Sequence, residues 1–182
     1  YLFDDVISIL GNPHVLTGNW RNRVTKSLWR NRLYLTFSLE TDVFATENDK
    51  KAAKGLSAPV HRMLNIAIHA LNGLLVVKIA ESLGLDPYIS AIGGLLWVAH
   101  PLAVNAVANI SGRSASLSAT FVFVAIWAVL SHHYWLIIPA LTLGVLIKED
   151  ALMGFPLISA IHALQGGFFW WIWCIPPLIG AF

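Results

Sequence analysis

A few charged side chains in an otherwise apolar sequence have the chemistry of a reactive site. Asp4 and Asp5 follow an apolar-aromatic start, and a carboxylate at a water boundary can take the proton of a hydroxyl group. Arg113 lies between Gly112 and Ser114, and a guanidinium presents planar paired donors that match phosphate. Two ordinary interpretations compete with these. Acidic residues also begin surface helices, and an arginine at a membrane boundary also extends its head group toward water.

A second charged cluster, Lys148-Glu149-Asp150, stands between two apolar runs. An ammonium group beside two carboxylates could contribute to a phosphate site near Arg113, and it could equally be a simple interfacial loop. Intramembrane and membrane-boundary charges are costly, so each one is a candidate for function.

Four polar residues recur at helical spacing in the next apolar stretch, at positions 61, 65, 69 and 72. At 100° per residue they fall on one stripe of a helix. His61, at the end nearest the polar N-terminal segment, is the best site candidate of the four. Hydrogen bonding between helices is the competing explanation for Asn65, His69 and Asn72. No carboxylate or cysteine joins the stripe, so we expect no metal site. A chlorin bound by one histidine, such as His69, His100 or His162, is chemically feasible, but nothing singles it out.

The composition shows what kind of protein must position these groups. The chain has 182 residues, of which 57% are hydrophobic and 12% charged, against roughly 25% charged in an ordinary soluble domain. This excludes a soluble enzyme and a disordered tail. The net charge of +2 does not indicate nucleic-acid binding. A single cysteine excludes an internal disulfide framework.

Charge also divides the chain, because 14 of its 22 charged residues lie in the first 58 positions. We expect an all-α, polytopic integral membrane protein with about six hydrophobic helices, preceded by a polar and amphipathic external segment over residues 1–58. The transmembrane domain is expected over 59–182, because about 20 apolar residues cross a bilayer as a helix. The approximate helices are 60–83, 88–111, 113–131, 134–147, 150–164 and 168–182. Pro101, after His100, is expected to interrupt or kink the second.

If each of these helices crosses, the candidate residues of the membrane region return to the side that holds residues 1–58. The two faces alternate, so the loops at 100–113 and 148–150 share that side. Five basic residues between positions 21 and 32, with Trp20 and Trp29 among them, indicate an interfacial stretch. Their charge favours the cytoplasmic face, although a helix preceding residue 1 could override it, so charge determines the side only weakly.

Taken in order, these motifs resemble the GT-C membrane glycosyltransferases, in particular the TPR-containing O-mannosyltransferase-like branch. The resemblance rests on Phe3-Asp4-Asp5 with Ile9 and Asn12, on the spacing of His61, Asn65 and His69, on the run from His100-Pro101 to Gly112-Arg113, and on Lys148-Glu149 with Ala151-Leu152 and Pro156. It covers nearly all of the chain but only the front part of such an enzyme.

The resemblance implies transfer of a hexose from a polyprenyl-phosphate-linked donor to a hydroxyl acceptor, at the outer, lumenal or periplasmic face. Asp4 or Asp5 would be the catalytic, acceptor-activating carboxylate. Arg113, with His100 or Lys148, would bind the lipid phosphate, and Glu149 would order that site. His61, a candidate from its place on the polar stripe, joins the same binding set. The implied partners are membrane lipids and the lipid-linked sugar, without a further cofactor.

The chain departs from that family at two acidic positions. The family usually has an acidic residue two positions after the arginine, where this chain has Ala115, and another shortly after His-Pro, where it has Val104-Asn105. The alternative is therefore a degenerate, non-catalytic relative. It would serve as a structural subunit of a larger membrane complex, such as an energy-transducing or photosynthetic one.

Overall fold

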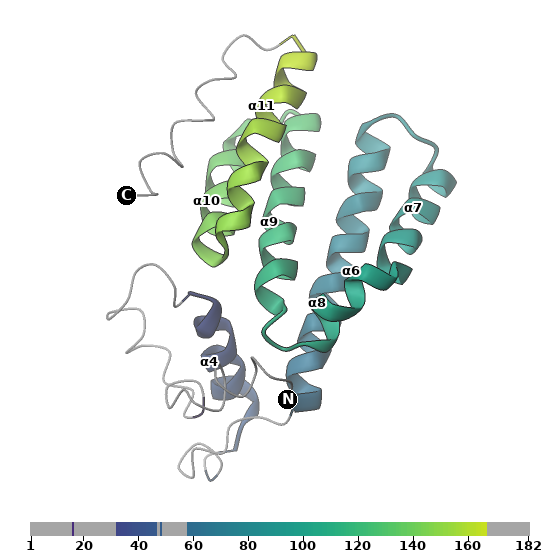
Figure 1. Cartoon of the computed structure of the whole chain (residues 1–182). Coiled ribbons are helices and arrows are strands. Elements are labelled where there is room, and N and C mark those ends of the chain that lie inside the picture. Colours follow the sequence, from purple (N-terminus) through teal and green to yellow (C-terminus); the bar gives the residue numbers. More distant parts are fainter. Residues whose placement is uncertain (1–15, 17–31, 47, 49–57, 167–182) are drawn as a thin grey trace. The chain divides into compact units, whose positions relative to one another are not determined.

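The computed structural model describes residues 16, 32–46, 48 and 58–166, and every regular element among them is helical (Figure 1). The expected all-α class is thus confirmed for this part of the chain. The expected helix 168–182 lies outside it. The elements are α4 (Arg32–Phe44), α6 (Ala58–Ser82), α7 (Pro87–Ala99), η2 (Pro101–Ala103), α8 (Val104–Ala108), α9 (Arg113–Leu130), η3 (Tyr134–Leu136), α10 (Ile137–Ile147), η4 (Glu149–Met153) and α11 (Gly154–Leu164).

The chain divides into two units, each formed from separate stretches of sequence. Unit 1 comprises Tyr1–Ala67 and Val104–Ser114, and unit 2 comprises Ile68–Ala103 and Ala115–Phe182. Helix α6 contributes its first turns to unit 1 and the rest to unit 2. The candidate residues are therefore divided between the units.

The turn between α6 and α7 forms where the sequence predicts a stop. Gly84 has φ +84°, a conformation that glycine adopts without strain, and the amide of Leu85 donates to the carbonyl of Ala80 (3.2 Å). Asp86 then caps α7 by accepting from the amide of Tyr88 (2.8 Å), and Pro87 is in the first turn. Proline is favoured there because its missing amide would have no helical partner.

The interruption expected at His100-Pro101 is present. Helix α7 ends at Ala99, and His100 is extended, with φ −67° and ψ 127°, as the residue before a proline tends to be. The chain continues through the short elements η2 and α8. The apolar run from 88 to 111 is therefore a broken helix.

Two helices of the described residues are long and apolar enough to cross a membrane, Pro59–Ser82 and Arg113–Leu130. A third span results if α7 and the broken segment after it count as one. The apolar stretch Tyr134–Ile147 has 14 residues, about 21 Å of helix, which is shorter than the roughly 30 Å bilayer core. The six crossings, and the shared face that depends on them, stay predictions.

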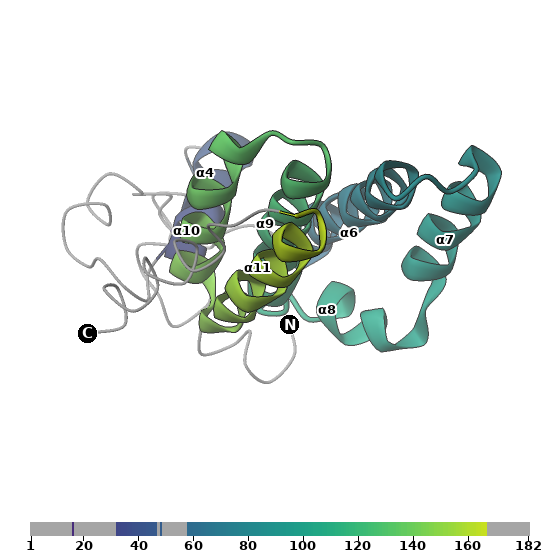
Figure 2. The same cartoon turned by 90° about the horizontal axis from the view of Figure 1, so that it is seen from above.

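The core of unit 2 is apolar and closely packed. Helices α9, α10 and α11 lie side by side in both views (Figures 1 and 2). Small side chains on α9 meet larger ones from α10 and α11, and the core they form comprises Ala125, Ala128, Val129, Ile137, Ala140, Leu141, Phe155 and Ile158. Small residues let helix backbones approach closely, which is the usual basis of helix association in membranes.

Candidate functional site

Arg113 owes its position in unit 1 to the tight turn before it. A Cβ on Gly112 would lie 2.9 Å from the carbonyl oxygens of both Asn105 and Ala106, so only glycine allows the turn to pass this close to α8. Ile110 in the same turn is fully buried, and its carbonyl accepts from the amide of Arg113 (3.2 Å). Helix α9 then begins at Arg113 itself.

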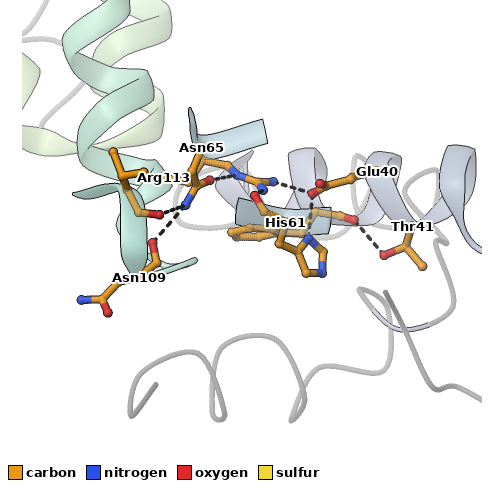
Figure 3. Close-up of polar contacts among 8 residues, drawn as sticks. Glu40, Thr41, His61, Asn65, Asn109 and Arg113 are labelled. Carbon is orange, nitrogen blue, oxygen red and sulfur yellow. Dashed lines mark hydrogen bonds and ion pairs between the residues drawn. The ribbon is translucent and has the colours of Figure 1, made fainter. Parts of the chain in front are cut away.

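The guanidinium of Arg113 is completely enclosed by protein, with 0% of the residue exposed. Each of its nitrogens donates to a protein oxygen (Figure 3). Nε donates to Asn65 Oδ1 (2.8 Å), Nη1 to Glu40 Oε2 (2.8 Å) and Nη2 to the carbonyl of His61 (2.9 Å). The ring of Phe37 lies 4.1 Å from Cζ, close enough for a cation–π contact.

Glu40, on α4, is the counter-ion of this arginine. Only 5% of the residue is exposed, and its Oε2 also lies 2.7 Å from Nδ1 of His61. A carboxylate oxygen can only accept, so Nδ1 of His61 carries the shared hydrogen. One carboxylate oxygen therefore receives a guanidinium donor and an imidazole donor together, which is a strong charge-assisted arrangement.

Asn65 fixes the same cluster to the chain segment around the turn. Its Oδ1 accepts from Arg113, and its Nδ2 donates to the carbonyls of Asn109 (3.0 Å) and Val107 (3.4 Å). Arg62, which follows His61 in α6, donates from Nε to the carbonyl of Ala108 (3.2 Å). The first turns of α6 thus satisfy carbonyl groups that α8 and the turn would otherwise leave open.

This arrangement is chemically an oxyanion site. Arginine and histidine donors converge on one oxygen, in a buried setting where electrostatic interactions are stronger than in water. Here the oxyanion is supplied by the protein itself. A phosphate oxygen is recognised by the same donors with similar geometry.

Two of the predicted phosphate-binding residues, His61 and Arg113, are therefore brought together in unit 1. The other three belong to unit 2. The His100 ring is exposed, and its Nδ1 accepts from the amide of Leu102 (3.2 Å). Lys148 is ion-paired with Asp150, and Glu149 is exposed. Asp4 and Asp5 lie outside the described residues.

Sequence reasoning does not find Glu40, because it assigns residues 1–58 to an external segment. The sequence nevertheless carries a signal. Phe37, Glu40 and Thr41 are spaced i, i+3 and i+4, which places them on one face of a helix, and all three are buried. An acidic residue on the same face as an aromatic residue indicates a partner of opposite charge.

The rest of the polar stripe on α6 belongs to unit 2 and forms hydrogen bonds between helices. Nε2 of His69 lies 3.1 Å from the carbonyl of Val98. Asn72 donates to the carbonyl of Ser116 (2.9 Å) and accepts from Thr120 (2.7 Å). These contacts favour the helix-packing interpretation of His69 and Asn72. Within the described ranges, no three His, Cys, Asp or Glu side chains converge to hold a metal ion.

Comparisons of the chain with family models, with curated proteins and with solved structures find no match.

Proposed function

We propose that this chain is a GT-C-like membrane transferase. It would move a hexose from a polyprenyl-phosphate-linked donor to a hydroxyl acceptor at the outer, lumenal or periplasmic face. About six hydrophobic helices would cross the membrane. The observation that carries the proposal is the meeting of Arg113 and His61 on a single anionic oxygen.

The chemistry of the donor explains why such a site is needed. The departing lipid phosphate gains negative charge as the bond to the sugar breaks, and fixed donors aimed at that charge stabilise the transition state. Arg113 would supply paired donors to the phosphate, and His61 a further one. Asp4 or Asp5 would take the proton of the acceptor hydroxyl as it attacks.

Sugar transfer from a radiolabelled polyprenyl-phosphate-hexose tests this function directly. Membranes containing the full chain should incorporate label into acceptor material. The variant with Asp4→Asn and Asp5→Asn should lose this incorporation, whereas Asp42→Asn, which alters an exposed acidic residue of α4, should retain it. If wild type and the double variant both incorporate label only at the background level, the proposed enzymatic function is contradicted.

A second function, that of a non-catalytic structural subunit, is favoured by a different observation. Arg113 is fully buried and all its nitrogens are engaged by protein groups, which suits a residue that stabilises a fold. Ala115 and Val104-Asn105 also stand where the resembled family has acidic residues. In that case Arg113→Gln would destabilise the chain, and no sugar transfer or lipid-phosphate binding would be measured.

A further inference from the structure

The oxyanion that Arg113 and His61 contact is the carboxylate of Glu40. This glutamate differs in its burial from the other acidic side chains that the structure describes. Among the acidic residues that the structure describes, Glu40 alone is buried. A buried carboxylate needs both a counter-charge and hydrogen-bond donors, and its Oε2 obtains these from Arg113 and His61. The carboxylate thus fills the position in which the proposed function requires a phosphate oxygen.

An incoming phosphate therefore has to exchange with this carboxylate. The guanidinium has no exposed surface, and each nitrogen already donates to protein. Exchange of one oxyanion for another keeps the arginine paired throughout, and this avoids the large penalty of an uncompensated buried charge.

We propose that Glu40 is an internal substitute for the phosphate: it occupies the Arg113–His61 site in the empty chain, and α4 is released when a phosphate oxyanion displaces it. This rests on the proposed function, because it assumes that Arg113 and His61 bind phosphate. Glu40 is then a residue that sets the affinity of the site, through competition, without contacting the bound ligand.

The side chains around Glu40 fit this exchange. The inward face of α4 also presents Phe37, whose ring contacts both the guanidinium and, edge to face at 5.6 Å, the ring of His61. The outward face exposes Leu39 and Val43, and Phe44, the last residue of the helix, is exposed as well. Release of the carboxylate thus uncouples α4 from Arg113 and His61 while its outer apolar face can stay in a membrane interface, as amphipathic helices do.

Binding of polyprenyl phosphate to the full chain in phosphatidylcholine nanodiscs tests the competition. Glu40→Gln keeps the shape of the side chain and removes its charge. It should bind polyprenyl phosphate roughly 10- to 100-fold more tightly than wild type, because a charged carboxylate no longer competes for the donors of Arg113 and His61. Asp42→Asn, the matched change on the exposed face of the same helix, should leave the affinity unchanged. Inorganic phosphate added to nanodiscs without polyprenyl phosphate distinguishes a free phosphate ligand from a lipid head group.

The outcomes separate the two proposals. If Arg113→Gln abolishes binding while Glu40→Gln binds as wild type does, the competition is overturned and the phosphate site survives. If wild type and Glu40→Gln both fail to bind either form of phosphate, both proposals fall.

A second measurement needs no change at Glu40 and so remains informative if that variant does not fold. Spin labels at Val43 on α4 and Met63 on α6 occupy exposed positions, in a chain with Cys174 replaced by serine. Polyprenyl phosphate should lengthen the distance between the labels, and phosphatidylcholine alone should not. An unchanged distance at saturating polyprenyl phosphate would overturn the release of α4.

Discussion

The two units of this chain differ in whether they bury charge. Among the described residues, the buried Glu40 and Arg113 both belong to unit 1, whereas unit 2 buries apolar and neutral polar side chains. At the centre of unit 2 are alanine, valine, leucine, isoleucine and phenylalanine from α9, α10 and α11. At the centre of unit 1 are an arginine, a glutamate, a histidine and an asparagine, all within 5% exposure. The stability of unit 2 should therefore depend on the volume of its side chains, and that of unit 1 on charge and hydrogen-bond partners. Substitutions in each unit test this contrast.

The largest effect is expected from Arg113→Met, which removes the only charge that faces Glu40 in the described contacts. Breaking a buried ion pair from one side costs about 3–5 kcal/mol, since the other charge stays buried and uncompensated. The free energy of unfolding can be measured by SDS titration in mixed micelles. Lys78→Met is the control, because that lysine is 60% exposed and paired with Glu81 at the surface; it should change stability by less than about 1 kcal/mol.

In unit 2 the corresponding change is Ile158→Ala, which opens a cavity in the apolar core. If α11 lies in lipid, as proposed, much of the transfer free energy is absent, and the expected loss is about 2 kcal/mol, at the lower end of the range for such truncations. Leu157→Ala alters the neighbouring residue, which is 47% exposed. The same loss from both variants would show that packing does not govern this unit.

Close packing between α6 and α7 gives a smaller effect. A Cβ on Gly94 would lie 2.9 Å from the carbonyl oxygen of Gly73 and against the side chain of Val77. Gly94→Ala should therefore lower the unfolding free energy by about 1.5 kcal/mol through overpacking. The adjacent Gly93 has open space around the same position. Gly93→Ala should be neutral or slightly stabilising, because alanine favours helix, and a matching loss in both would refute the packing argument.

The smallest effect tests whether polar contacts matter in unit 2. Thr120→Val removes the donor to Asn72 Oδ1, and such bonds within membranes are worth about 0.6 kcal/mol on average. Thr142→Val, at an exposed position, is the control. If Thr120→Val lowered the free energy of unfolding as much as Arg113→Met does, the two units would not differ in their dependence on charge.

The sequence predicts the helices well because their limits are local. Gly84, Asp86 and Pro87 end one helix and begin the next, and Pro101 breaks the following one, all through the backbone geometry of neighbouring residues. Whether a helix can cross a membrane depends on its length, and the stretch 134–147, taken alone, is shorter than the bilayer core. Apolar composition alone does not distinguish a short packed helix from a spanning one.

The candidate site was only partly predictable, since its contacts join distant positions. Arg113 and His61 stand out as polar residues in apolar surroundings, but Glu40 lies 73 residues from Arg113 in the chain. No local pattern specifies that pairing. The i, i+3, i+4 spacing of Phe37, Glu40 and Thr41 indicates only that α4 has a buried face.

A double-mutant cycle between Glu40 and Arg113 tests most directly that charge stabilises unit 1. Glu40→Met and Arg113→Met should each destabilise the chain strongly. The double variant should be more stable than either single one, with a coupling free energy of at least about 2 kcal/mol, because apolar residues can replace a buried ion pair when both partners change. If the losses of unfolding free energy from the two single variants simply add in the double variant, the ion pair does not stabilise unit 1.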